Sequence, residues 1–155
     1  MKRQIAKGLA MLMMTLALAA ASAAVANGQS SERMAAQVPF EFIVADKTLR
    51  AGEYQVGALN QHGDVIAISS YGGDNALRNS SPRERGGKLD AKLVFHKYGS
   101  TYFLAQVWMA GERTGRELAK TRQERAAERE LKKIATYRGE SGPVYEIVEV
   151  MATGR

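Results

Sequence analysis

The chain has 155 residues, 45% of them apolar and 25% charged, which is typical of one ordinary globular domain rather than of a disordered or fibrous protein. It contains no cysteine, so disulfide bonds, thiol catalysis, cysteine-ligated zinc and the lipidated cysteine of a bacterial lipoprotein are excluded. The formal net charge is +6.

Residues 1–26 have the pattern of a secretory signal peptide. Three cations among the first seven residues precede an apolar run at 8–21, which is shorter than the roughly 20 residues that a helix needs to cross a bilayer. Ala-Val-Ala at 24–26 fits a cleavage site, Ala-Ser-Ala at 21–23 is the second choice, and a retained N-terminal anchor is the alternative to cleavage. We expect a mature chain that begins at Asn27, has a net charge of 19 minus 16, or +3, and contains no transmembrane segment. Its expected location is periplasmic or secreted, and it is not expected to be a lipoprotein.

The mature chain is expected to have a flexible leader at 27–36 and a single β-rich domain at 37–155. Apolar residues alternate from Val38 to Val44, which predicts a strand, and Pro39 favours an edge position or a strand start. A turn at 46–52 then leads into a strand at 53–59, so the two strands are expected to form a hairpin.

A short β-branched strand is predicted at 65–69, and a long polar stretch follows at 71–90. Loops of this length are uncommon in compact domains. The stretch therefore either contains a short strand near 75–78 or is functional or mobile.

The clearest hairpin spans residues 91–109 around a Gly99-Ser100 turn. In this register the numbers of paired residues sum to 199, and both faces of the ribbon are largely apolar. One face carries Val94, His96, Tyr98, Phe103, Ala105 and Val107, and the other carries Leu93, Phe95, Tyr102, Leu104, Gln106 and Trp108. Two apolar faces require cover on both sides, and the segment after the hairpin offers a helix for one of them.

Thr121 and Glu124 have the spacing of a capping box, which predicts a helix that begins at Arg122 and ends at Gly139. Its apolar stripe is narrow and consists of Ala127, Leu131, Ile134 and Ala135. A last strand is predicted at 144–151. The expected fold is mainly β, an antiparallel sandwich or small open barrel of about six strands, with one C-terminal amphipathic helix before the last strand.

Motifs for catalysis, cofactors and metals are weak. His62 and His96 have no metal-ligand spacing, no G-x-S-x-G motif occurs, and the two Gly-Gly pairs lack the context of a phosphate-binding loop. We therefore predict no catalytic, cofactor-binding or metal-binding residues and no cofactor. His96 is interpreted as a packed or half-exposed sheet residue rather than a general base.

The helix and its approach form the one candidate electrostatic surface, because residues 111–133 hold eight basic and five acidic residues. The candidate residues for an anionic partner are Arg122, Arg125, Arg129, Lys132 and Lys133. The bland interpretation is an exposed helix face stabilised by pairs such as Glu128 with Lys132. Nucleic acid is not an expected partner, because no aromatic residues alternate with the cations.

A second candidate site is an apolar pocket on the hairpin, made by Phe95, Tyr102, Leu104 and Trp108, and suited to a small apolar ligand or lipid in a β-barrel. Core packing against the helix is the competing interpretation, since aromatic residues at strand spacing usually fill interiors.

Five segments of the chain resemble a family of small exported proteins of unassigned function found in Acidobacteria. These segments are Val38-Pro-Phe-Glu-Phe42, Leu49-x-Ala-Gly-Glu-Tyr54, Lys92-Leu-Val-Phe-His-Lys-Tyr-Gly99, Tyr102-Phe-Leu-Ala-Gln-Val-Trp108 and Gly115-Arg-Glu-Leu118. The similarity covers most of residues 38–133. Relatives often have proline in place of Arg50 and Ala119, which fits an extended segment at 115–118 and a helix that begins only after Thr121. The resemblance implies export but no activity.

The sequence thus predicts an exported, non-enzymatic binding or structural module whose partner is unknown, with an anionic surface or a protein as candidates. The alternatives are a carrier of a small apolar ligand or lipid in a β-barrel pocket, and a hydrolase that uses His96 or paired glutamates.

Overall fold

The computed structural model describes residues 33–60 and 62–154, which belong to the compact unit Ser31–Arg155. The predicted signal peptide and the first part of the predicted leader, residues 27–32, lie outside the described residues.

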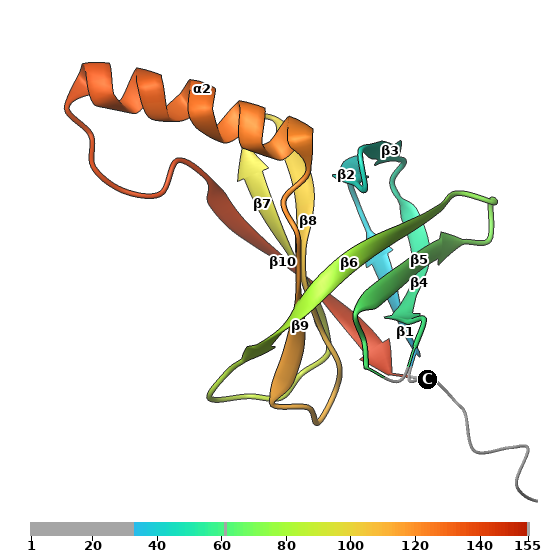
Figure 1. Cartoon of the computed structure of the whole chain (residues 1–155). Helices are drawn as coiled ribbons and strands as arrows, with labels where there is room; N and C mark the ends of the chain where they lie inside the picture. The colour runs from blue at the N-terminus through green and yellow to red at the C-terminus, as the bar shows by residue number, and fades with distance from the viewer. Residues whose placement is uncertain (1–32, 61, 155) are drawn as a thin grey trace, which may run out of the picture. The chain divides into compact units, whose positions relative to one another are not determined.

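The described residues form a closed antiparallel barrel with two extra strands and one helix (Figure 1). The elements are β1 Arg33–Val38, β2 Phe42–Val44, β3 Lys47–Leu49, β4 Gly52–Ala58, β5 Val65–Ser70, β6 Asn75–Glu84, β7 Lys92–Tyr98, β8 Thr101–Trp108, β9 Thr114–Leu118, α2 Arg122–Arg138 and β10 Glu146–Gly154. The ring of the barrel runs β8-β7-β10-β1-β4-β5-β6-β9 and returns to β8, where β9 pairs antiparallel through Gln106 with Glu117. Strand β2 adds to the other half of β8 in parallel and carries β3. The mainly β class and the helix before the last strand are confirmed, but this part of the chain has ten strands rather than about six.

Strand β1 corrects the predicted leader, because residues 33–36 are part of the barrel wall. Met34, Ala36 and Val38 alternate into the core, and β1 pairs with β4 along its whole length and with β10 at 34–36. With two alanines, residues 33–36 lack the strong apolar alternation that predicts a strand, although Ala36 packs in the core.

The predicted hairpin of 38–44 with 53–59 is wrong in its pairing. The chain leaves the wall after Val38, and β4 pairs with β1 instead. The interposed residues form their own hairpin, in which β2 and β3 join through Ala45 and Asp46 at φ 52° and 59°. Two successive left-handed residues suit a two-residue turn between antiparallel strands, but alanine is not a residue that signals one.

The long polar stretch contains a strand, which was one of its two predicted alternatives. Strand β6 is longer than expected, because it pairs first with β5 and then with β9.

The hairpin of β7 and β8 keeps the predicted register from Tyr98–Thr101 to Phe95–Leu104, and then shifts by one residue at a β-bulge. Beyond the bulge the paired numbers sum to 200, as in Leu93 with Val107. The shift places Val107 in the barrel core with Leu93, Phe95 and Leu104. A bulge exchanges the faces of all later residues on its strand, which explains why the predicted face assignment fails after Leu104.

The core fills the barrel with apolar side chains from every part of the ring. Phe42 contacts Tyr54 and Phe95 edge-on, with ring centroids 5.1 and 5.3 Å apart. Phe40, from the connection between β1 and β2, stacks on Tyr102 at 3.9 Å. Aromatic pairs of this kind stabilise a core by about 1 kcal/mol beyond the area that they bury.

Candidate functional site

Helix α2 begins and ends where its capping residues predict. Thr121 is the N-cap, and its Oγ1 atom accepts a hydrogen bond of 2.9 Å from the backbone N–H of Glu124. Gly139 ends the helix in the left-handed conformation, with φ 70°. These local signals fix the bounds of the helix, because each capping group satisfies a backbone group that the helix leaves unpaired.

Glu124 departs from the predicted capping box. Its side chain turns toward the barrel, where Oε1 lies 3.0 Å from His96 Nδ1 on β7 and 3.4 Å from the hydroxyl oxygen of Tyr98. Glu124 is 2% exposed and His96 7% exposed. The contact joins the first turn of α2 to the hairpin face that carries His96 and Tyr98. The helix after the hairpin does cover one of its faces, but not the face of Phe95 and Leu104, against which it was expected to pack.

Tyr145, just before β10, covers the imidazole. Its ring lies 4.1 Å from that of His96 and 5.4 Å from that of Tyr98, measured between centroids. Burial raises the pKa of Tyr98, and the nearby Glu124 carboxylate raises it further, so this hydroxyl stays protonated and can donate to Glu124. We call His96, Tyr98, Thr121, Glu124 and Tyr145 the α2 junction.

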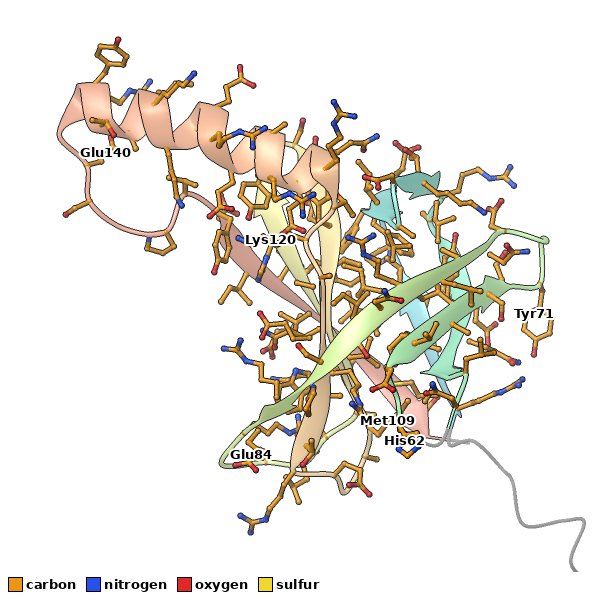
Figure 2. The ribbon with its side chains drawn as sticks, viewed as in Figure 1. His62, Tyr71, Glu84, Met109, Lys120 and Glu140 are labelled. Carbon is orange, nitrogen blue, oxygen red and sulfur yellow. The ribbon has the colours of Figure 1, made fainter. Side chains whose placement is uncertain are left out.

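Lys120 holds the segment just before α2 in place. Its Nζ atom lies 2.8 Å from Glu128 Oε2 and 5.7 Å from the centre of the Tyr145 ring (Figure 2). The Arg78 guanidinium on β6 donates to the backbone carbonyls of Ala119 and Lys120, at 2.8 and 2.9 Å. The start of α2 is therefore held to β6, to β7 and to the segment before β10.

The chemistry of the junction favours anchoring over catalysis. The Nδ1 atom of His96 is bonded to Glu124, and Tyr145 packs against the ring. A general base needs access to the proton that it removes, and a buried, partnered imidazole has little. The sequence interpretation of His96 as a packed sheet residue agrees with this placement. Its partner Glu124 was missed, because the capping pattern already explains a glutamate at this position.

Beyond its first turn α2 runs past the barrel wall (Figure 1). Glu124 is the single fully buried residue among the 17 of the helix, and the predicted apolar stripe is only partly covered: Ile134 is 42% exposed. Side chains with nitrogen ends project from the helix into solvent (Figure 2). The C-terminal part of α2 is thus an arm held at one end.

The five candidate cations all lie on one exposed side of α2, two of them in its first turn and three on the arm. Arg122, Arg125, Arg129, Lys132 and Lys133 are exposed, and a turn of 3.6 residues places them within an arc of about 100° around the helix axis. We call these five residues the basic face.

Each of the three carboxylates of α2 lies outside this arc. Glu124 is buried at the junction, and Glu128 is bridged by Lys120 and by Lys132, the latter at 2.9 Å. The predicted i,i+4 pair of Glu128 with Lys132 is therefore present. Glu130 lies beyond the edge of the arc, at about 60° from Lys133. The basic face keeps an uncompensated positive charge although the helix contains both signs.

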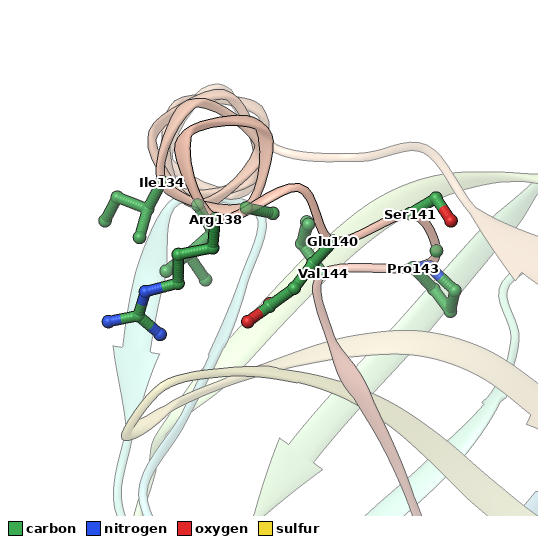
Figure 3. Close-up of a pocket in the computed structure, with 9 residues that line it drawn as sticks. Ile134, Arg138, Glu140, Ser141, Pro143 and Val144 are labelled. Carbon is green, nitrogen blue, oxygen red and sulfur yellow. The ribbon is translucent and has the colours of Figure 1, made fainter.

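A shallow pocket of about 250 Å³ lies under the far end of α2 (Figure 3). Its lining includes Leu131, Ile134, Ala135, Pro143 and Val144, with Arg138 and Glu140 also contributing. It opens on the side of the helix opposite to the basic face.

The structure does not bring the four candidate pocket residues onto one surface. Phe95 and Leu104 are buried in the barrel core, and Tyr102 packs against this core beside Phe40. Trp108 lies on the outer face because of the bulge, where the Arg85 guanidinium stacks 4.7 Å from its ring centre and Gly115 lies directly against it. The competing interpretation, core packing against the helix, is right that Phe95 and Leu104 are core residues, but they pack inside the barrel and not against α2.

Within residues 33–60 and 62–154, no cluster of three or more His, Cys, Asp or Glu side chains could hold a metal ion. No helix of this same part is long and apolar enough to span a bilayer. Comparison of the chain with protein-family models, with curated proteins and with solved structures finds no match in any of the three.

Proposed function

We propose that this protein is an exported, non-enzymatic binding module that holds an anionic partner on the basic face of α2. The observation that carries the proposal is the separation of charge on this helix: five exposed cations share one arc, while the carboxylates of the helix are buried, bridged or outside it. Lys132 pairs with Glu128 at the edge of the face, and the other four cations have no ion-pair partner among residues 33–60 and 62–154.

The junction supports the same proposal, because it fixes which side of α2 is free. Glu124 binds His96 on the barrel side, so the centre of the basic face, about 130° around the axis, is turned away from the barrel. Charges on a helix that is already held in place attract an oppositely charged surface. Because no flexible loop has to become ordered first, the entropic cost of binding is lower.

The test is retention of the exported protein on heparin-agarose in a salt gradient. The variant Arg122→Gln/Arg125→Gln/Arg129→Gln removes three charges from the basic face. The matched control Lys47→Gln/Lys88→Gln/Arg113→Gln removes three exposed charges that lie outside α2. We expect the first variant to elute at clearly lower salt than the wild type and the control to elute close to it. Equal shifts for both variants would show that net charge alone governs binding and would contradict the proposal.

A further inference from the structure

We infer that the basic face of α2 docks on the surface of an anionic lipid bilayer, with Tyr137 in its interfacial region. This inference rests on the proposed function and names its partner. It is drawn from the shape of the charged surface and from the residues at the free end of the helix.

The first step is geometric. The five cations extend along about 17 Å of one helix at 1.5 Å per residue, and the centre of their arc lies about 130° around the axis from Glu124. Beyond its first turn α2 runs past the barrel wall (Figure 1), and all five cations are exposed. A flat partner can therefore contact all the cations at once.

The second step concerns Tyr137, which is 92% exposed although it is aromatic. It lies four residues after Lys133, so the two side chains are neighbours on the helix surface, about 40° apart around the axis. Tyrosine is enriched at membrane–water interfaces, where its ring contacts the acyl boundary and its hydroxyl stays wet. Solvent gives this ring nothing to pack against, whereas an interface does.

The third step is energetic. The electrostatic attraction between one lysine or arginine and an anionic bilayer raises the binding constant about 5-fold. Three of them together should contribute about 100-fold. The attraction is screened beyond about 8 Å at physiological salt, so it requires cations that reach the surface, as exposed arginine side chains do.

The experiment is sedimentation of the exported protein with vesicles of phosphatidylglycerol and phosphatidylcholine, compared with vesicles of phosphatidylcholine alone. We expect binding to the anionic vesicles only, weakening with salt, and about 100-fold weaker for Arg122→Gln/Arg125→Gln/Arg129→Gln. Tyr137→Ser should weaken binding several-fold, whereas the control Tyr71→Ser, which changes a tyrosine that is 73% exposed on the barrel, should not.

Three outcomes separate the two proposals. Binding of anionic vesicles that depends on the basic face and on Tyr137 supports the bilayer. Retention on heparin that depends on the basic face, without vesicle binding, keeps the proposed function but overturns the bilayer in favour of a glycan or an acidic protein. Vesicle and heparin binding that are both indifferent to the three arginines would overturn both.

Discussion

Replacing His96 with alanine tests whether the junction anchors α2. The Glu124 carboxylate is buried, with His96 Nδ1 at 3.0 Å and the Tyr98 hydroxyl at 3.4 Å. Removing His96 leaves the buried Glu124 side chain without its nearest hydrogen-bond partner, which costs about 1–3 kcal/mol. It also removes the ring that packs on Tyr145, which costs about 2 kcal/mol more. The Tyr98 hydroxyl remains and offsets about 1 kcal/mol. We therefore expect His96→Ala to lower the free energy of unfolding by about 2–4 kcal/mol, a large share of the 5–15 kcal/mol typical of a domain.

Urea unfolding with two probes measures this loss and shows where it falls. The chain has a single tryptophan, Trp108, whose fluorescence reports on the barrel wall, while far-UV circular dichroism includes the signal of α2. If the loss exceeds the free energy that docks α2, the helix detaches while the barrel stays folded. The circular dichroism transition would then precede the fluorescence transition, whereas we expect the two to coincide in the wild type.

A double-mutant cycle with Glu124→Ala gives the coupling between the two side chains. We expect the double variant to be more stable than the sum of the single effects predicts, by about 1–3 kcal/mol. The control His62→Ala changes an exposed turn residue and should alter stability by less than about 0.5 kcal/mol. A loss below about 1 kcal/mol for His96→Ala, with additive single effects, would refute the anchoring role.

Two further predictions concern packing and pH. Gly115→Ala should destabilise the barrel by about 1–3 kcal/mol and shift the Trp108 emission, because an added Cβ would overlap the indole ring; Gly86→Ala, which meets nothing within 4 Å, should not destabilise it. Hydrogen bonds from Lys120 and Lys132 hold the pKa of Glu128 below its ordinary value of 4.5. Their stabilisation is complete above pH 4.5 and is lost as the pH falls through the lowered pKa, so Glu128→Gln should reduce the free energy of unfolding at neutral pH but not at about pH 2.

The features that sequence predicts well here depend on near neighbours in the chain. The start of α2 at Arg122 follows from Thr121, its end follows from Gly139, and the tip of the β7–β8 hairpin follows from Gly99. Each residue acts on backbone groups within four positions of itself. The basic face belongs to the same class, because helical periodicity alone brings its members together.

The features that sequence does not predict depend on distant partners. With the bulge before Gln106, β8 pairs with β9 beyond the bulge, and Phe95 still pairs with Leu104 before it. The residues of the hairpin alone do not indicate that β8 has this second partner strand. Closure of the barrel through Gln106 and Glu117 likewise has no local signal. A face assignment that extrapolates a perfect alternation therefore fails at the residue where the tertiary structure needs a change of face.

Glu124 shows how one position can satisfy a local pattern and serve a distant one. A glutamate three residues after Thr121 is expected to reach back to the N-cap, but its partner is His96, 28 residues earlier in the chain. The N-cap needs only the Thr121 hydroxyl, so the carboxylate is free to bind the barrel. Because the centre of the basic face lies about 130° around the axis of α2 from Glu124, this contact also sets the direction of that face. Loosening the junction should thus weaken binding to an anionic surface even though no charge on that face has changed.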